Sequence, residues 1–390
     1  MNKQIRLTKE FDGYFMVDFG YLKPYINELL YFLDGNEYMQ TIDFAKTILF
    51  NAEIKFNNNI EGINDGIEVI DEIIDKMYLN LHGLETKRII NLYKGYRYIL
   101  SGQEINKDTL KQLYGILSDG LLNDSDKAMM GEYYRLGDVN ILRGGHLVKP
   151  YMGMEENINN PFTGVRYDKI EKLMDVFFEY INSDTPNDEV SVFIKSQIMH
   201  FYFVYIHPYF DVNGRTSRTL AMWYLLNNKS YPYIIFNRAI AFSEKTYSDN
   251  IVKGKVSGDI TLFLRYMLES VLRALEKEYL INNIVNNSSV SLSKDERQIL
   301  ECFLSLKGEI TVKDLASVYN SYNNKKKIME LYKNKILTLI NKGILLDLGN
   351  TKSYIAPGIN NIKLAINKEN ISVDSEKVKH LKLNKYTYWE

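Results

Sequence analysis

Apolar side chains recur at every third or fourth position over much of the chain, the spacing that places them on one face of an α-helix. The pattern begins over residues 37–58 and returns in eight later segments, each of which it predicts as a helix. The first 280 residues are therefore predicted to be mainly α-helical. The later segments are 67–79, 86–101, 107–118, 167–182, 188–206, 214–227, 243–253 and 259–283.

One segment within this helical part has a different pattern. Val139 and Ile141 precede the pair Gly144–Gly145, and Leu147 follows it. Apolar residues on both sides of a glycine turn are typical of a β-hairpin. The pattern predicts such a hairpin over residues 132–151.

The C-terminal part reads as a separate small domain over residues 292–358. Residues 283–291, NIVNNSSVS, form a polar interruption that predicts the boundary before it. Helices are expected at 294–306, 312–319 with Thr311 as its cap, and 325–342, followed by a hairpin over 344–355 that turns at Gly349 and Asn350. Three helices and a two-stranded wing are typical of the winged helix, a variant of the helix-turn-helix. The tail, residues 359–390, has no assigned structure.

Composition narrows the class of protein further. The chain holds 48 basic and 49 acidic side chains, so no overall field attracts it to nucleic acid or to an anionic membrane. No apolar stretch is long enough to span a bilayer. Cys302, the single cysteine, lies in an apolar run and is expected to be a buried thiol, which fits a reducing cytoplasm.

Residues 207–218, HPYFDVNGRTSR, lie between two predicted helices and read as a loop that leads into the second. Pro208 disfavours helical geometry at His207, so the first helix should end there and the imidazole should turn away from it. Asn213 is a residue type that favours a helix start. Gly214 allows the backbone to come close to a ligand.

These residues together have the equipment for phosphoryl or nucleotidyl transfer. The first amides of the second helix form an anion site, to which Arg215 and Arg218 add fixed positive charge. Asp211 offers a hard oxygen ligand for Mg²⁺. His207, with an ordinary pKa of about 6.5, is suited to take a proton from an incoming hydroxyl. The alternative is an ordinary loop with a solvated helix face.

The same segment resembles the signature of the Fic family, His-Pro-Phe-x-Asp/Glu-Gly-Asn-Gly-Arg-x-x-Arg. Tyr209 stands where the family has phenylalanine and should keep an aromatic plug under the loop. Val212 stands where the family has the first glycine. This departure matters more, because a β-branched residue resists a positive φ and adds bulk beside the phosphates.

The resemblance covers about residues 40–280 and implies a Fic-fold helical core with a β-hairpin flap. It implies that the protein moves AMP from ATP onto a protein hydroxyl, since the related Doc kinases carry lysine at the position of Gly214. The roles implied are His207 as general base, Asp211 as the Mg²⁺ ligand, Asn213 and Gly214 at the α-phosphate, Arg215 at the phosphates and Arg218 at the γ-phosphate. The domains implied are 1–110 as an N-terminal helical region, 111–283 as the Fic core with flap 132–151 and motif 207–218, and 292–358 as the winged helix.

The hairpin also resembles the Fic flap that precedes the motif. Such a flap can add a strand from a target protein and place its hydroxyl over His207. The resemblance therefore implies a docking role for Val139, Asn140 and Ile141. The alternative is a hairpin with a structural role alone.

A third segment resembles an inhibitory motif found N-terminal to the core in one class of Fic proteins. It is NNNIEG, Asn57 to Gly62, at the end of an expected inhibitory helix near residues 50–62. Glu61 would pair with Arg218 and keep the guanidinium from the γ-phosphate. Asn57 stands where Ser or Thr is usual, which predicts weaker anchoring of that helix. The alternative is an exposed glutamate at a helix end.

Three functions remain open on the sequence. The first is a cytoplasmic adenylyltransferase that uses ATP and Mg²⁺ on a protein target, itself included, with a homodimer expected from the resemblance and AMP removal as a second activity. The second is a regulator that binds DNA through its C-terminal domain and senses nucleotide with its Fic core. The third is a scaffold disabled by Val212. The basic helix that supports DNA binding, or alternatively a solvated face on a protein-binding domain, carries Lys325, Lys326, Lys327, Lys333 and Lys335.

Overall fold

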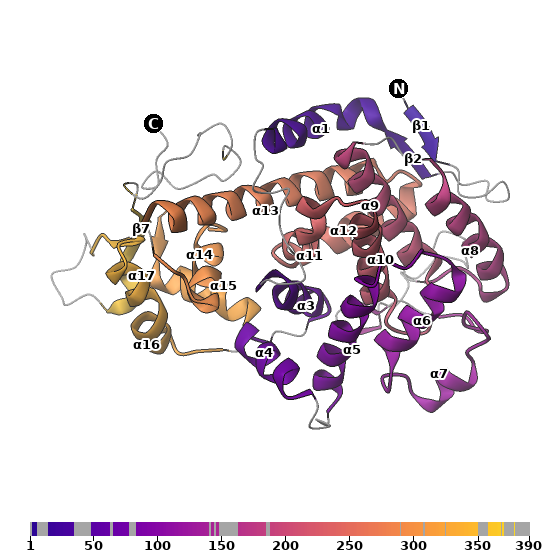
Figure 1. The fold of residues 1–390 in the computed structure, drawn as a ribbon, viewed down its shortest axis with the longest axis horizontal. Coiled ribbons are helices and arrows are strands. Elements are labelled where there is room, and N and C mark those ends of the chain that lie inside the picture. The colour runs from indigo at the N-terminus through magenta and orange to yellow at the C-terminus, as the bar shows by residue number, and fades with distance from the viewer. Residues whose placement is uncertain are drawn as a thin grey trace. The chain divides into compact units, whose positions relative to one another are not determined.

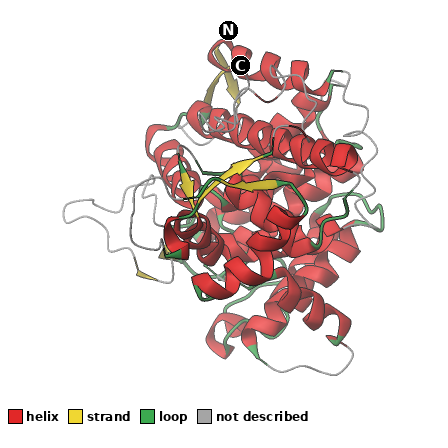
Figure 2. Cartoon of the chain, turned by 90° about the vertical axis from the view of Figure 1, so that its left-hand side faces the viewer, coloured by secondary structure: helices red, strands yellow, loops and turns green. Residues whose placement is uncertain are grey.

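The computed structural model describes residues 2–5, 15–34, 48–62, 65–77, 83–139, 142–143, 146–147, 163–184, 188–288, 290–306, 309–323, 325–349 and 358–367, with residues 369 and 378. Helices dominate these residues, and the strands are short (Figure 2). By its internal contacts the chain divides into two compact units, Met1–Ile63 with Ile73–Val271, and Asn64–Glu72 with Leu272–Glu390.

The first unit contains most of the helices that the apolar spacing predicts, with ends within a few residues of the expected ones. The start expected at residue 37 lies outside the described residues, and α1, α7 and the stretch from η3 to α11 were not predicted. The helices are α1 (Phe19–Leu33), α3 (Ile48–Ile60), α5 (Leu84–Ile99), α6 (Lys107–Ser118), α7 (Asp124–Ala128), α8 (Tyr167–Asn182), α9 (Glu189–Ile206), α10 (Asn213–Asn227), the 3₁₀-helix η3 (Tyr231–Ile235), α11 (Phe236–Ala241) and α12 (Glu244–Ser257).

Helices α9 and α10 form the centre of the first unit. α9 is apolar on all sides and is buried over most of its length, as such a helix must be in a globular protein. α10 packs along α9 and also contacts α3, α5 and α6 (Figure 1). Trp223 of α10 is fully buried, and its indole donates a hydrogen bond of 3.0 Å to the backbone carbonyl of Gln103. The six-residue loop between α9 and α10 is thus held at the core of the unit.

A short N-terminal hairpin was not predicted. Strand β1 (Asn2–Ile5) pairs antiparallel with β2 (Phe15–Asp18). β2 is fixed by the end of α12, because Met16 N donates to Gly258 O at 2.7 Å and Ile260 N donates to Met16 O at 3.0 Å. Each strand has only four residues, and its partners lie far away in the sequence. The chain therefore shows no alternating apolar pattern from which these strands could be predicted.

Helix α13 (Thr261–Ser288) runs through the segment that the sequence predicts as a domain boundary. The division between the units falls earlier, between Val271 and Leu272, inside the helix. The polar run stays helical because its amides find partners one turn away. Asn287 donates to Asn283 Oδ1 at 3.0 Å, and Ile284 between them is fully buried.

After α13, the described residues of the second unit form three α-helical segments, short 3₁₀ turns and a three-stranded antiparallel sheet. Thr311 caps α15 as expected, with its hydroxyl oxygen accepting from Asp314 N at 3.2 Å. The third segment is one continuous helix with a π-helical turn, η4, in its middle. The segments are α14 (Lys294–Phe303), α15 (Val312–Tyr322), and α16 (Ile328–Leu331) with η4 (Tyr332–Ile336) and α17 (Leu337–Asn341).

The sheet of this unit corrects the expected wing. Among the described residues, strand β6 (Leu345–Asp347) pairs with β7 (Lys363–Ile366), which lies in the tail without assigned structure. β7 also pairs with β5 (Ile310–Thr311), giving the order β5-β7-β6. Burial of Leu364 to Ile366 explains the choice, because β7 is the central strand. Residues 350–357, including the predicted turn residue Asn350, lie outside the described residues, and the winged helix itself stays a prediction.

Helix α4 (Ile67–Asp75) lies in the N-terminal part of the sequence, but its first residues belong to the second unit. Glu68 pairs with Lys335 at 3.2 Å and with Lys326 at 3.7 Å. Lys335 also pairs with the buried Asp295. Two lysines of the basic helix are therefore neutralised within their own unit.

Two smaller expectations concern burial. Cys302 is buried, as predicted. Among the helices of the described ranges, none combines the length and the apolar character needed to cross a bilayer.

Two glycines in helices provide a test of the packing. A Cβ at Gly254 of α12 would lie 2.8 Å from the ring of Phe201, whereas one at Gly115 of α6 would meet no atom within 4 Å. We predict that Gly254→Ala lowers the free energy of unfolding by about 1–2 kcal/mol through overpacking. Gly115→Ala should raise it by about 0.5–1 kcal/mol through helix propensity. Urea unfolding of both variants measures this, and effects of the same sign would contradict it.

Candidate active site

The site begins where α9 ends. His207 caps α9 in the left-handed conformation, with φ 54° and ψ 59°, and Pro208 follows. Pro208 prevents α9 from continuing, as predicted. The backbone at His207 is left-handed and not extended. Arg135, which is 1% exposed, holds this turn, since its Nε donates to His207 O at 2.9 Å and its backbone N donates to Pro208 O at 3.0 Å.

The imidazole of His207 is neutral at pH 7. Burial and the charges of Lys255 and Arg135 lower its pKa to about 3, although a weak bond to the Val204 carbonyl acts in the opposite direction. Nδ1 lies 3.4 Å from Val204 O, the arrangement in which Nδ1 carries the proton. Nε2 is then left with the lone pair that a general base needs.

The loop after His207 rests on aromatic rings and on one amide. Tyr209 is 1% exposed and stacks on Tyr114 of α6, with ring centroids 3.5 Å apart and planes 7° apart. Tyr209 therefore does lie under the loop. The side chain of Asn213 accepts from Tyr209 N at 3.0 Å and donates to Tyr209 O at 2.7 Å. The Asn213 amide thus shapes the loop, and only its backbone N–H is left to face a ligand.

Val212 adopts the strained conformation that the sequence pointed to. Its φ is 66° and its ψ is 7°, a left-handed geometry that costs a residue with a Cβ about 1–2 kcal/mol. The side chain is 3% exposed, so its burial offsets part of that cost. Val212 N donates to Asp211 Oδ1 at 2.6 Å, and Val212 O accepts from Thr216 N at 2.9 Å. The loop therefore keeps the turn without the glycine.

The amino end of α10 offers an anion site. The first bond of the helix runs from Thr216 N to Val212 O, so the amides of residues 213–215 lie ahead of the hydrogen-bond ladder. Arg215 is 4% exposed, and its Nε and Nη1 have no hydrogen-bond partner among the described residues. Burial lowers the pKa of Arg215, while Glu61 and Asp211 act in the opposite direction. A buried guanidinium with open donors is suited to an anionic ligand.

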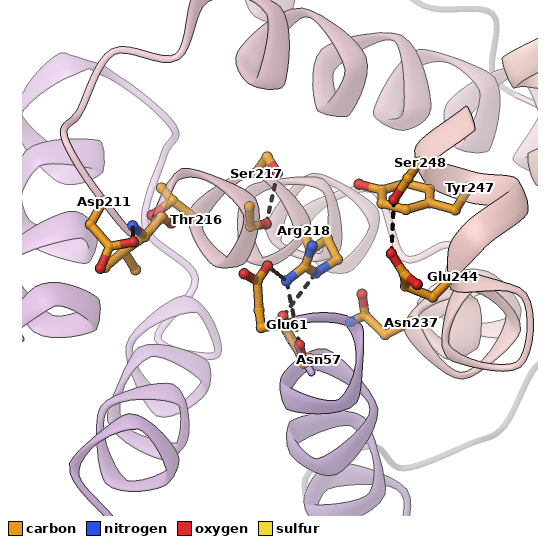
Figure 3. Close-up of polar contacts among 12 residues, drawn as sticks. Asn57, Glu61, Asp211, Thr216, Ser217, Arg218, Asn237, Glu244, Tyr247 and Ser248 are labelled. Carbon is orange, nitrogen blue, oxygen red and sulfur yellow. Dashed lines mark hydrogen bonds and ion pairs between the residues drawn. The ribbon is translucent and has the colours of Figure 1, made fainter. Parts of the chain in front are cut away.

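Arg218, one turn further along α10, is already engaged. It is 1% exposed, and its guanidinium reaches α3 (Figure 3). Nε donates to Asn57 Oδ1 at 2.8 Å, and Nη2 donates to Glu61 Oε1 at 2.6 Å. Asn57 also donates to the hydroxyl of Tyr96 at 3.0 Å. The residue expected to anchor α3 weakly therefore bridges α3 to both α10 and α5.

Glu61 lies between several positive charges. Desolvation raises its pKa, but the charges of Arg218 and Arg215 outweigh this and hold the pKa below its ordinary value. A Cβ at Gly214 would lie 2.6 Å from Glu61 Oε1. The missing side chain at Gly214 thus leaves the space that the carboxylate occupies.

Two neighbours of the motif arginines have no signal in the sequence. Arg88 of α5 acts on Glu61 and on Arg215 through its charge, and its Nε has no hydrogen-bond partner in the described part of the chain. On the other side, Tyr247 of α12 lies by Arg218 (Figure 3), and its hydroxyl contacts His200 Nε2 at 2.8 Å. Arg88 lies on an ordinary amphipathic helix, so only the fold reveals its position.

The remaining predicted residues lie at the edge of the described structure. Asp211 is exposed at the start of the site, and no cluster of three or more metal-ligating side chains occurs within the described residues. Val139 O accepts from Gly164 N at 3.2 Å at the base of the flap, whose strands are β3 (Leu142–Arg143) and β4 (His146–Leu147). Asn140 and Ile141 lie outside the described residues.

A family model described as the Fic/DOC family matches residues 104–225, which include α6 to α9, the loop at His207 and most of α10. The chain carries a Fic domain. A crystal structure of a Fic family protein from Desulfovibrio desulfuricans G20 has a similar fold, with a TM-score of 0.52 at 18% identity over 88% of this chain and 96% of that chain. The predicted mainly α-helical Fic fold is thus confirmed.

Curated relatives of the Fic domain include two insect proteins. The protein adenylyltransferase Fic of Drosophila mojavensis is 28% identical over 179 residues, which are 45% of this chain and 32% of that protein. The protein of the same name from Drosophila grimshawi is 32% identical over 104 residues, 27% of this chain and 20% of that protein. The matches span about a third or less of the relatives' own length.

The lowered pKa of Glu61 predicts a pH-dependent contribution to stability. Its carboxylate stabilises the fold above the pKa of unfolded glutamate, about 4.3, and loses this effect as the pH falls through the lower folded value. We expect Glu61→Gln to lower the free energy of unfolding by at most about 1 kcal/mol at pH 7, because the side chain is 37% exposed. The difference should shrink towards zero at pH 3. Urea unfolding at both pH values checks this, with the exposed Glu104→Gln as control.

Proposed function

We propose that the Fic domain transfers AMP from ATP to a hydroxyl group of a protein and releases pyrophosphate. The observation that carries the proposal is that a suitable base and a suitable anion site lie close together in the sequence. His207, at the start of the loop, is a neutral imidazole. Arg215, in the first turn of α10, is a buried guanidinium with open donors. The names of the insect relatives support the same activity.

The proposed reaction is a displacement at the α-phosphorus. The target hydroxyl oxygen forms a bond to the α-phosphorus, and the bond from that phosphorus to the oxygen bridging to the β-phosphate breaks. His207 Nε2 accepts the hydroxyl proton, and the electron pair of the broken bond leaves with pyrophosphate. Since the imidazole is neutral at pH 7, it can accept this proton without first losing one.

The amino end of α10 would hold the phosphates. The open nitrogens of Arg215 and the amides of residues 213–215 are aimed at an anion, and fixed donors of this kind stabilise the charge that develops in the transition state. Arg218 would bind the γ-phosphate once its present partners release it. Arg88 adds a third positive charge beside the same group of residues.

Asp211 is the residue that would hold Mg²⁺. Its carboxylate is exposed, and Mg²⁺ with a nucleotide is commonly held by only one or two carboxylates together with phosphate oxygens. The absence of a larger acidic cluster from the described residues fits that mode of binding. When bound, the ion would neutralise phosphate charge.

Glu61 would keep the enzyme inactive. Its carboxylate occupies Arg218 and adds negative charge where the γ-phosphate would lie, so ATP would be bound in an unproductive way. Asn57 supports this state, because it holds the same guanidinium from the preceding turn of α3. The proposed protein is therefore an autoinhibited adenylyltransferase.

The proposed partners are ATP and a protein with an exposed hydroxyl, this chain included. A target strand would dock on the flap at residues 139–141. The second unit gives less support for DNA binding than its sequence did, because Lys326 and Lys335 are paired with Glu68. Removal of AMP would use the same site and stays an alternative outcome of the assay.

We predict that transfer can be followed with labelled ATP. With Mg²⁺ and α-labelled ATP, Glu61→Gly should label protein more strongly than wild type does, because Arg218 is released. His207→Ala in the same background should lose label by about 100-fold or more, the usual contribution of a general base. A denaturing gel with the label retained on protein measures both effects.

The γ-labelled nucleotide is the control for this experiment. Label from γ and not from α would identify a kinase and overturn the proposal. No label from either nucleotide in Glu61→Gly would support the scaffold disabled by Val212.

Asn57 provides a second test of the inhibited state. We expect Asn57→Ala to transfer label faster than wild type but more slowly than Glu61→Gly, because Arg218 Nε loses its acceptor Asn57 Oδ1 while Nη2 keeps its bond to Glu61. The matched control is Asn58→Ala on the same helix, whose side-chain amide is buried without a hydrogen-bond partner in the described chain. Initial rates with α-labelled ATP compare them, and equal rates for the two alanine variants would contradict the role of Asn57.

A further inference from the structure

A buried lysine lies beside the proposed general base. Lys255, on α12, is 5% exposed, although a lysine is rarely buried without a partner. Its Nζ donates to Val204 O at 3.2 Å. That carbonyl belongs to the last turn of α9 and is the same one that Nδ1 of His207 approaches at 3.4 Å.

The shared carbonyl links the two side chains chemically. Val204 O is one of the carbonyl groups at the end of α9 that lack a partner in the helix, and a cation there also interacts well with the helix dipole. Its second lone pair can accept from His207 Nδ1, which fixes the tautomer with Nε2 free. An ammonium group on the same oxygen draws electron density from it. The carbonyl then stabilises a protonated imidazole less.

Two cations in the described part of the chain act on His207. Lys255 acts from α12 and Arg135 from the start of the flap segment, where its Nε donates to the His207 carbonyl. Both oppose a positive charge on the imidazole. Arg135 makes several backbone contacts that fix the loop, whereas Lys255 reaches the end of α9 through its bond to Val204 O.

We propose that Lys255 is a positioning residue of the transfer site: it holds the Val204 carbonyl that fixes the tautomer of His207, and it places a positive charge beside the imidazole. This inference rests on the proposed function for its catalytic meaning. The effect on the imidazole does not depend on that function. Burial also lowers the pKa of Lys255 itself to about 7, so its charge weakens above neutral pH.

The test is an NMR titration of the full-length protein with labelled histidine, in which the His207 signal is identified by its loss in His207→Ala. Lys255→Met, of similar length and no charge, should raise the pKa of His207 by about one unit or more, since it removes a nearby like charge. Lys255→Arg should keep it near the wild-type value. Lys253→Met, at an exposed position of the same helix, is the control. A Lys255→Met value equal to that of Lys253→Met would overturn the inference.

The pH dependence of label transfer links this to catalysis. In the Glu61→Gly background, Lys255→Met should move the acid limb of the rate profile to higher pH by the same amount as the titration, and Lys255→Arg should restore it. If Lys255→Met still transfers label but its acid limb lies at the same pH as that of the Glu61→Gly background, the catalytic role is contradicted. If no variant transfers label, the proposed function fails, and the titration alone decides whether Lys255 acts on His207.

Discussion

The burial of one guanidinium determines how the first unit is built. Arg218 lies in the middle of α10 at 1% exposure, where an unpaired charge would cost several kcal/mol. It must therefore have acceptors, and α3 provides them through Asn57 and Glu61. α3 is thus fixed against α10 by a polar contact as well as by its apolar face. The arrangement places a carboxylate at the amino end of a helix that is otherwise suited to phosphate.

The two arginines of the motif are in opposite states. Nε and Nη1 of Arg215 have no hydrogen-bond partner among the described residues, whereas the guanidinium of Arg218 is bonded to Asn57 and Glu61. Both arginines lie within one turn of α10. An anion could therefore enter at Arg215 first, while the last phosphate of a nucleotide would have to compete with Glu61. Under the proposed function, this geometry would separate the binding of a nucleotide from its productive placement. An autoinhibited transferase requires such a separation, since it would stay loaded and inactive.

Much of the fold and of the site could be predicted from local sequence. Helices such as α6 and α8 follow directly from apolar spacing, and the order of groups between His207 and Arg218 indicates the chemistry. The errors had two kinds of cause. A distant one decided β7, which needed β6 and β5 to become a strand, and a local one decided the asparagine run of α13, which stayed helical with side-chain bonds one turn apart. Arg88 and Lys255 carry no motif, so only the folded chain brings them to the site.

The route of the chain between the two units has a further consequence. Residues 64–72 leave the first unit directly after Glu61 and Gly62, join the second unit through Glu68, and return before α5. The units are therefore connected at three points and not at one. A protein cut after α13 begins would keep the first residues of α4 but lose the lysines that hold them, and buried Ile67 and Ile70 would face water. Exchanging the C-terminal part alone would therefore strand residues 64–72, which follow Glu61 directly in the sequence.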